Sequence, residues 1–470
     1  MIINKITDFL FRPTDIASLV FFRVIFGMIA FADVVAGFVY LHLIKDVFNP
    51  DKFQFRYYGF EWVRPLSEPW MSLFFILLLL ASIGITLGKW YRVSSTFFAF
   101  GFVYVFLLEK AYYLNHGYLI CLLSFIIILM PLNRAFSLDA LKKPIIKADQ
   151  VPYWSLFLLQ FMMGLVYFYG GIAKLNMDWL NGIPLLFWLQ NKANTPIIGS
   201  FVAHDWVAYF MSYGGLLLDL FVTFFLIQRR TRIWALGFVL FFHLTNFILF
   251  QIGVFPFLSI TLTLLFFPSD FPRKGIDYLV NKFSFLQQWR MQATVFIEKK
   301  YPNYIQAPTV DTLQHFNHQK KWIPAFLILF ISLQLLIPLR HHYFKGSVAW
   351  TEEGHRYSWR MMLRSKSGYG HFEVIDGQTL EKIRIAPIDF LNKRQKRKLY
   401  THPDMILQFA HFLRDKYQAE GMKDVKVFAH IKTKLNGRKY QPYIDSERDL
   451  AQEKWLFFEE SDWIVPLKEK

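Results

Sequence analysis

The stretch Tyr167-Phe-Tyr-Gly-Gly-Ile-Ala-Lys-Leu-Asn-Met-Asp-Trp179 decides how this chain is organised. It closes an apolar run, from Tyr153 to Ile172, that is long enough to cross a lipid bilayer. Lys174 stands where this run ends, and the two glycines before it let a neighbouring backbone or a flat ligand come close. A lysine half out of water can act as a neutral base. The alternative is a lysine that extends to the bilayer surface beside an interfacial Trp179.

The composition indicates a protein that crosses the membrane several times. The 470 residues are 54% hydrophobic and include 53 phenylalanines, and the apolar residues come in blocks. Much of the net charge of +17 lies in loops beside these blocks, where it indicates topology and lipid contact rather than nucleic-acid binding. Cys121 is the single cysteine, so an intrachain disulfide, a dithiol redox centre and a cysteine metal cluster are excluded.

Hydropathy predicts an α-helical multi-span membrane domain over residues 1–339. Gly253 and Pro256 predict a tight turn or a broken helix between the seventh and eighth spans. Residues 180–200 contain two prolines and are predicted to be interfacial or re-entrant. The nine predicted spans are about 16–42, 70–88, 91–108, 117–132, 153–173, 206–228, 233–252, 254–268 and 322–339.

The loop charges predict the orientation of these spans. With a cytoplasmic N-terminus, the inner segments carry 19 lysines and arginines and the outer loops carry 7. Nine spans then place the last part of the chain outside the cytoplasm, in the periplasm of a bacterium or the lumen of a eukaryotic organelle. The N-terminus lacks the basic start and cleavage site of a signal peptide.

Residues 340–470 predict a small mixed α/β extracytoplasmic domain with a β-sheet. An Asp376-Gly377 turn predicts a hairpin over 370–386, and Asn436-Gly437 predicts a second strand pair over 425–444. Residues 402–420 are predicted to be helical. For the basic run Lys393 to Lys398, a solvated face is the favoured interpretation, with a patch for lipid or an acidic substrate as the alternative.

Ionisable residues within spans are the next signal. Arg23 and Asp33 are about 15 Å apart along one helix, so they cannot pair directly, and we expect each of them, like Asp219, to form a polar clamp with another span. His243 and Asn246 share a helix face. For this pair, an interhelical hydrogen bond and a functional site are equally good interpretations.

A second dense stretch runs from Tyr104 to Tyr118 in the outer turn between the third and fourth spans. Asn115 supplies neutral hydrogen-bond donors, and His116 can accept or give a proton near neutral pH. Because no second histidine follows His116 at metal-ligand spacing, we predict no metal.

Seven motifs in order make the chain resemble the vitamin K-dependent gamma-carboxylase (gamma-glutamyl carboxylase) family. The resemblance begins at Thr14 and extends nearly to the C-terminus. The motifs are Tyr104-Val-Phe-Leu-Leu-Glu-Lys110 with Asn115-His116 and Tyr118; Tyr167-Phe-x-x-Gly-x-x-Lys174-Leu-x-x-Asp178-Trp179; Leu216-Leu-Leu-Asp219-Leu; Phe242-His243-x-x-Asn246; Leu249-Phe-x-Ile-Gly253-x-Phe; Trp350-Thr with Tyr357-Ser-Trp359-x-Met-Met; and Asn436-Gly437-Arg438 with Gln441-Pro.

The resemblance implies a mechanism. A lysine matching Lys174 deprotonates vitamin K hydroquinone, which reacts with O2 to give a strongly basic alkoxide and leaves as the 2,3-epoxide. The alkoxide removes a γ-proton from a peptide glutamate, and the carbanion adds CO2. In this scheme His116 serves the glutamate and CO2 half of the reaction. Asn115 positions the hydroquinone, and we assign His243 and Asn246 to the same quinone site.

The resemblance also implies substrates and partners. The segment from Trp350 to Met362 is associated with glutamate binding, and we take Trp350, Tyr357, Trp359 and Arg360 as its substrate-binding residues. The cofactor is reduced vitamin K, as phylloquinone or menaquinone hydroquinone, with O2 and CO2 as co-substrates and no metal. The partners are a glutamate-containing peptide or protein, the lipid bilayer and a quinone reductase that supplies hydroquinone.

Departures from the animal sequences are informative. The cysteines that join the membrane and lumenal parts are absent, so the two parts must be coupled noncovalently, and this fits a bacterial member. Ala173 replaces a lysine that precedes the essential one in animal sequences. Two alternatives stay open: a relative that epoxidises without carboxylating, and a membrane carrier or quinone-binding protein on the same scaffold. A carrier would place charged residues near the membrane midplane, whereas the candidate residues cluster at the outer edge.

Overall fold

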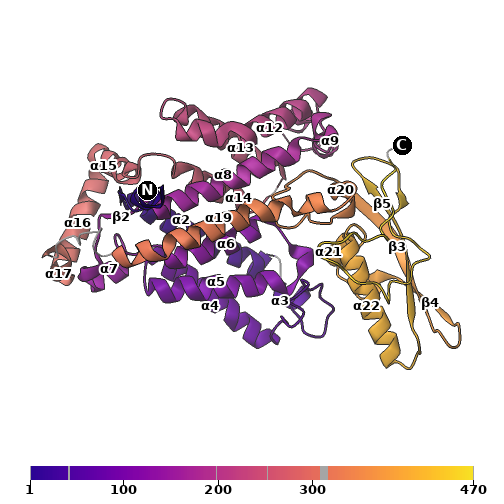
Figure 1. Cartoon of the computed structure of the whole chain (residues 1–470). Coiled ribbons are helices and arrows are strands. Elements are labelled where there is room, and N and C mark those ends of the chain that lie inside the picture. The colour runs from indigo at the N-terminus through magenta and orange to yellow at the C-terminus, as the bar shows by residue number, and fades with distance from the viewer. Residues whose placement is uncertain (1, 41–42, 197, 251, 307–315, 469–470) are drawn as a thin grey trace.

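Nine apolar helices form the membrane part of the computed structural model, which describes residues 2–40, 43–196, 198–250, 252–306 and 316–468 (Figure 1). Seven of them are long enough to cross a bilayer, and α6 and α14 are shorter. All nine coincide with the predicted spans. They are α2 (Ala17–Val35, continued by the π-helical turn η1, Ala36–Tyr40), α4 (Glu68–Leu87), α5 (Tyr91–Leu108), α6 (Asn115–Leu129), α8 (Trp154–Lys174), α12 (Asp205–Ile227), α13 (Arg232–Phe250), α14 (Phe255–Leu264) and α19 (Ile323–Leu336, continued by the 3₁₀ helix η5, Ile337–Tyr343).

Short elements connect these helices. Gly253 has a left-handed backbone, with φ of 65°, between α13 and α14, so the predicted break is confirmed. The 180–200 segment forms short helices rather than a span. The short elements of the membrane part are α1 (Ile2–Leu10), β1 (Pro13–Asp15), α3 (Leu43–Asp46), η2 (Lys110–Tyr112), α7 (Leu138–Lys142), η3 (Pro144–Ile146), β2 (Gln150–Pro152), α9 (Met177–Leu180), α10 (Leu185–Gln190), α11 (Gly199–Val202), α15 (Phe271–Lys282), α16 (Ser284–Lys300), α17 (Pro302–Gln306) and η4 (Asn317–Lys321).

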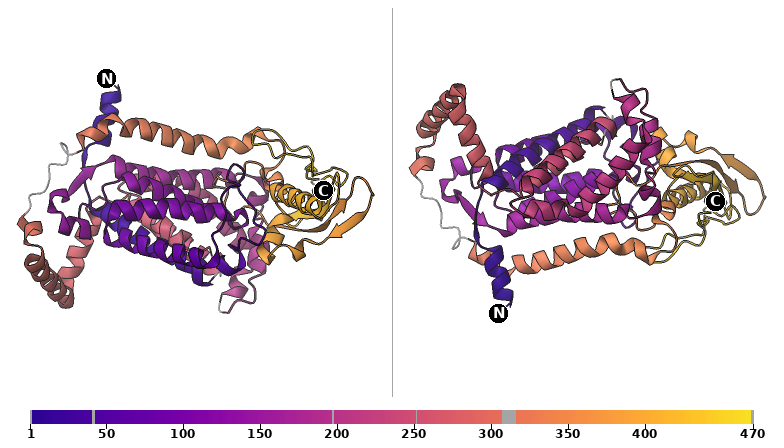
Figure 2. Two further views of the ribbon diagram at one scale, coloured as in Figure 1. Left: turned by 90° about the horizontal axis from the view of Figure 1, so that it is seen from below. Right: turned by 90° about the horizontal axis from the view of Figure 1, so that it is seen from above.

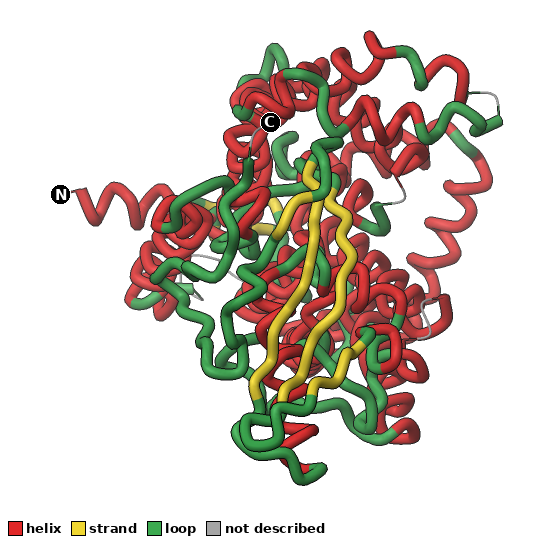
Figure 3. Tube along the Cα trace, turned by 90° about the vertical axis from the view of Figure 1, so that its right-hand side faces the viewer, coloured by secondary structure: helices red, strands yellow, loops and turns green. Residues whose placement is uncertain are grey.

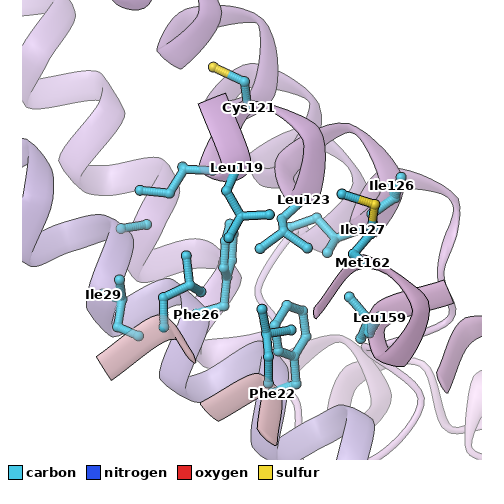
Figure 4. Packing of buried hydrophobic residues seen from close by; sticks show 14 of the residues in the cluster. Phe22, Phe26, Ile29, Leu119, Cys121, Leu123, Ile126, Ile127, Leu159 and Met162 are labelled. Carbon is cyan, nitrogen blue, oxygen red and sulfur yellow. The ribbon is translucent and has the colours of Figure 1, made fainter. Parts of the chain in front are cut away.

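The core of the membrane part is formed where α2, α6 and α8 meet. Phe22 and Phe26 of α2 pack against Leu123 of α6 and Met162 of α8, and all four are fully buried (Figure 4). Because lipid gives helices no hydrophobic reason to associate, close packing of this kind holds the bundle together. Arg23 does not pair with an acid among the described residues. Its guanidinium donates to backbone carbonyls of the loop after α6, including that of Leu132 at 2.9 Å.

The C-terminal part is a four-stranded antiparallel sheet packed on α22 (Figure 3). The strand order is β4-β3-β5-β6, and both predicted hairpins and the predicted helix are confirmed. Phe372 and Val374 point from β3 toward α22 and are fully buried. The elements are α20 (Val348–Thr351), β3 (Lys366–Ile375), β4 (Lys382–Ile385), η6 (Pro387–Asp389), α21 (Lys393–Leu399), α22 (Pro403–Ala419), β5 (Lys426–Leu435) and β6 (Gln441–Pro442).

The sheet-containing part caps one end of the helix bundle, and α15, α16 and α17 lie at the opposite end (Figures 1 and 2). The helix α19 runs along the outside of the bundle and joins the two ends (Figure 2). The start of α6 and the end of α8 therefore lie at the capped end.

Candidate functional site

A cavity of about 1040 Å³ lies between the capped end of the helix bundle and the C-terminal part. Its membrane wall is mainly aromatic and aliphatic, with few polar groups, which is the usual character of a small-molecule site. Six of the nine predicted site residues line it: Asn115, His116, Lys174, His243, Asn246 and Arg360. Asp33 and Asp219 line it as well.

Lys174 is buried at the end of α8 and forms an ion pair with Asp219 of α12. Its ammonium also donates to the carbonyl of Gly170 at 3.2 Å. The two glycines make this pairing possible because α12 approaches α8 closely there. A β-carbon on Gly171 would lie 2.8 Å from the side chain of Leu220, and one on Gly170 would lie 3.0 Å from Asp219 Oδ2. The glycine pair therefore allows the backbone of α12 to approach α8 closely. Asp219 forms the predicted polar clamp between these two helices.

Two histidines flank the ring of Phe255. The centroid of the His116 ring lies 6.4 Å from that of Phe255, and the centroid of His243 lies 5.8 Å from it. The Nε2 atom of His243 lies 2.8 Å from the hydroxyl oxygen of Tyr167. His243 Nδ1 is buried and has no hydrogen-bond partner among the described residues. Since an unpaired buried nitrogen is costly, this atom is suited to a polar group of a bound ligand.

This arrangement fits a hydroquinone. The apolar wall suits a flat lipid-soluble ring, and the polar residues His243, Asn246 and Lys174 line the same cavity. A hydroquinone hydroxyl could be matched by these polar groups, and its ring by the aromatic side chains.

Asn115 joins the membrane part to the segment that carries the other predicted site residues. Its Oδ1 accepts a hydrogen bond of 3.0 Å from Tyr113, and its Nδ2 donates at 3.4 Å to the carbonyl of Arg360. Tyr113 in turn accepts a 2.8 Å hydrogen bond from the backbone NH of Tyr357.

The segment from Glu352 to Met362 has an unusual backbone. Four non-glycine residues have positive φ: Glu352, Tyr357, Trp359 and Met362, with values of 64°, 68°, 57° and 51°. Bulky residues rarely adopt this conformation, and clusters of such residues are typical of functional sites, where the surrounding structure holds them. Tyr357 is held by edge-on contacts with Tyr113 and Tyr118, whose ring centroids lie 5.6 and 4.9 Å away.

Trp350, Tyr357 and Trp359 do not line the cavity. The ring of Trp350 is buried against Tyr443 in the core of the C-terminal part, and its Nε1 donates to Val465 at 2.7 Å. Trp359 is also fully buried and packs on Tyr118. Their role in substrate binding stays a prediction. Their contacts favour an indirect role, in which these side chains hold the segment in place.

Sequence reasoning missed the cationic wall that the C-terminal part presents to the cavity. Glu352 binds Arg364 at 2.5 Å and Lys366 at 3.1 Å, but it does not neutralise the whole wall. Burial, and after it the charges of Arg364 and other arginines, lowers the pKa of Lys398 to about 7. The basic residues of the wall are Arg356, Arg360, Arg364, Lys366, Arg394, Arg397 and Lys398. The basic run from Lys393 to Lys398 was the sequence signal for this wall, but the composition of the run is equally suited to a solvated face.

Two protein-family models match the chain. Residues 11–271 match the HTTM domain, and residues 319–470 match the lumenal domain of vitamin K-dependent gamma-carboxylase. The chain belongs to the vitamin K-dependent gamma-carboxylase family. It is a gamma-carboxylase-like membrane protein, and the second match indicates that the C-terminal part of this carboxylase relative lies on the lumenal side. No solved structure matches the chain.

The two parts of this gamma-carboxylase relative are joined by ion pairs. Asp178, four residues after Lys174, forms a two-pronged pair with Arg438, both distances being 2.8 Å. Deeper in the interface, Asp404 of α22 lies 2.7 Å from Lys110 and 2.8 Å from Arg356. Cys121 is buried and not disulfide-bonded. Among the described residues, the coupling is therefore noncovalent, as the sequence predicts.

A second cluster has the residue types of a metal site. Potential ligand atoms of His371, Glu373 and His430 lie within 4.8 Å of one another on the open face of the sheet. Arg384 donates to His371 Nδ1 at 3.3 Å, and further cations surround the cluster. This positive surrounding opposes a bound cation.

Proposed function

We propose that this chain oxidises reduced vitamin K with O2 to the 2,3-epoxide and couples this oxidation to the carboxylation of peptide glutamate with CO2. The observation that supports the proposal is that residues suited to the cofactor and residues suited to a carboxylate substrate line one cavity. Lys174 and the two histidines lie on its membrane wall, and a wall of arginines and lysines lies opposite. A lipid-soluble cofactor and a carboxylate substrate can thus meet in one space.

The bound hydroquinone supplies, through its oxidation, a base far stronger than any side chain. Lys174 Nζ takes the proton that must first leave the cofactor. Lys174 can act in this way because the proton shared within its ion pair can lie on the carboxyl oxygen of Asp219. The amine of Lys174 is then neutral and can accept a proton from the cofactor. In a dry site the ionic and neutral forms of such a pair come close in free energy, because burial penalises separated charges. Asp219 is therefore the proposed proton partner of the base.

The other residues hold the substrates and exclude water. His243 and Asn246 bind the cofactor from α13, and Asn115 holds the Arg360 segment against the mouth of the membrane part. Arg360 lines the cavity and, among the described residues, its guanidinium has no ion-pair partner. We assign it to the glutamate carboxylate, since arginine binds carboxylates with two parallel hydrogen bonds. His116, beside Phe255, is placed to serve the glutamate and CO2.

We also propose that the N-terminus is cytoplasmic and the capped end extracytoplasmic. The 19-to-7 charge bias supports this orientation, as does the position of α15 to α17 at the end opposite the sheet. Cysteines introduced at Lys143 and Glu420 should be labelled from opposite sides of the membrane. Labelling of both from one side would contradict the orientation.

One assay tests the function. Purified protein is given reduced vitamin K, O2, labelled bicarbonate and a glutamate peptide, and epoxide and fixed label are measured separately. Both products are expected. Epoxide without fixed label would identify a relative that only epoxidises. Quinone binding with neither product would favour a carrier.

A further inference from the structure

A second large groove lies on the C-terminal part, outside the cavity. Its volume is about 1080 Å³, larger than a typical small-molecule pocket of about 300–1,000 Å³, and side chains from β3, β4, β5 and α21 line it. Six of its lining residues are cations: Arg384, Lys393, Arg394, Lys396, Arg397 and Lys432.

These cations are not neutralised. In the described part of the chain, none of the six forms an ion pair with a carboxylate, although fifteen lysine or arginine pairs with carboxylates occur elsewhere. Glu373 lies beside the groove, but it faces His430 at 3.5 Å and His371 at 3.7 Å. Basic side chains gathered in one concave surface repel one another, so the groove is complementary to a ligand with several negative charges.

The groove is joined to the catalytic cavity by α21. Arg394 and Arg397, which are three residues apart and therefore share a face of this helix, line both spaces. The helix itself is fixed in place, because Gln395 on its buried side donates to Glu109 of the membrane part at 2.7 Å. Asn392 caps its start. A ligand that lies in the groove and reaches α21 therefore meets the same two arginines that line the cavity.

We propose that this groove binds an acidic segment of the substrate peptide that flanks the glutamate held in the cavity. The inference rests on the proposed function, because the two arginines shared with the cavity are what favour a substrate peptide over other polyanions. An extended peptide directs alternate side chains to the same side, so several carboxylates of one segment can face the groove at once. The groove then makes the chain selective for glutamates in acidic surroundings.

Binding can be tested without turnover. The probe is a fluorescent aspartate-rich peptide that contains no glutamate, and its Kd is measured by anisotropy on the purified full chain. The test variant is Lys393→Gln/Lys396→Gln/Lys432→Gln, whose positions line the groove and not the cavity. The matched control is Lys423→Gln/Lys426→Gln/Lys454→Gln, which removes the same charge from exposed positions outside both spaces.

We expect the Kd to rise about tenfold or more in the test variant, to be unchanged in the control, and to rise with salt in the wild type. In the coupled assay, the KM of a glutamate peptide with an acidic extension should rise in the test variant, while the KM of the short peptide stays constant. Equal Kd values for wild type, test variant and control would overturn the proposal. If the peptide binds through the groove but the chain fixes no CO2, the groove is upheld and the carboxylase function is contradicted.

Discussion

Lys174 at the end of α8 is paired with Asp219 of α12, 45 positions further along the chain, and both side chains are buried. The approach of the two helices at Gly170 and Gly171 creates this pair. A lysine that works as a base must lose its proton reversibly, and a buried carboxylate beside it both holds the amine in place and can receive that proton.

Replacement of Lys174 by alanine should remove epoxide and carboxylated product together. The hydroquinone must lose its proton before any later step, so both products depend on this amine. A small exogenous amine should restore part of both activities. Epoxide formation at a nearly normal rate in Lys174→Ala would exclude the role of this lysine as the base.

Replacement of Asp219 by asparagine should destabilise the membrane part and lower both products in proportion. Loss of one partner from a buried ion pair costs about 3–5 kcal/mol, because the remaining charge has no compensation. The double variant Lys174→Met/Asp219→Leu should be more stable than Asp219→Asn, although it is inactive. Thermal melting in detergent measures this order, and a double variant less stable than the single one would show that the pair does not act as a unit.

Much of the fold could be predicted because its signals are local. Apolar runs marked the nine helices, and Asp376-Gly377 and Asn436-Gly437 marked the two hairpins. The Lys174 to Asp219 pair could not be derived in this way. Each residue stood out as a charge in or beside a span, but their pairing depends on how α8 packs on α12, and no local pattern contains that information.

The cationic wall shows a second limit of prediction from the sequence. The run from Lys393 to Lys398 has the composition of a solvated face, yet Lys398 is half-buried and lines the cavity, whereas Lys393 is exposed at the groove. The face that a short helix buries depends on its neighbours, here on the bond from Gln395 to Glu109. The tryptophans show the reverse case. The sequence predicts their place near the site, but both lie behind the lining residues: Trp350 packs on Tyr443 in the core of the C-terminal part, and Trp359, which has a positive φ, packs on Tyr118.

Replacement of His116 by alanine should uncouple the two products. His116 lies beside Phe255, and among the described residues no hydrogen bond or ion pair joins it to Lys174 or Asp219, so proton removal from the cofactor should persist. Epoxide should therefore form while carboxylation falls by about 100-fold, the usual scale for loss of a positioned acid or base. The ratio of epoxide to fixed label measures this effect. An equal loss of both products would instead assign His116 to the quinone site.

The ion pairs between the two parts predict an acid-sensitive interface. Burial alone would raise the pKa of Asp178, but hydrogen bonds from Arg438 and Asn436 outweigh it and lower the pKa below its ordinary value. The pKa of Asp404 is likewise lowered, since Arg356 and Lys110 outweigh burial. Because both pKa values are depressed in the folded state, their contribution to stability is complete above a pH of about 4 and is lost as the pH falls further.

Limited proteolysis between pH 7 and pH 3 should therefore release the C-terminal part only at the acid end. Asp178→Asn should shift this release to higher pH, because one carboxylate no longer contributes. Asp462→Asn is the matched control, since Asp462 pairs with Arg448 at 3.0 Å on an exposed surface and takes no part in the interface ion pairs. An identical profile for Asp178→Asn and wild type would show that the pair with Arg438 does not hold the two parts together.

The segment that carries Tyr357 and Arg360 separates a carboxylase from a bare epoxidase. A carboxylase must hold a glutamate side chain beside the cofactor, or the base formed there is quenched by water. Arg360→Gln should raise the KM of the glutamate peptide about 10- to 100-fold, the scale of a lost hydrogen bond to a charged group, and leave the KM of the hydroquinone nearly unchanged. Trp359→Ala should act in the same direction by loosening the segment.

Tyr357 provides a matched pair of variants. Its ring packs on Tyr113 and Tyr118, whereas its hydroxyl has no hydrogen-bond partner among the described residues. Tyr357→Phe should therefore behave like the wild type, and Tyr357→Ala should raise the peptide KM strongly, because the positive-φ backbone loses the contacts that hold it. If the wild-type protein instead forms epoxide at a rate indifferent to added peptide and fixes no CO2, the segment only packs the two parts together. The chain would then be an epoxidase of the carboxylase family.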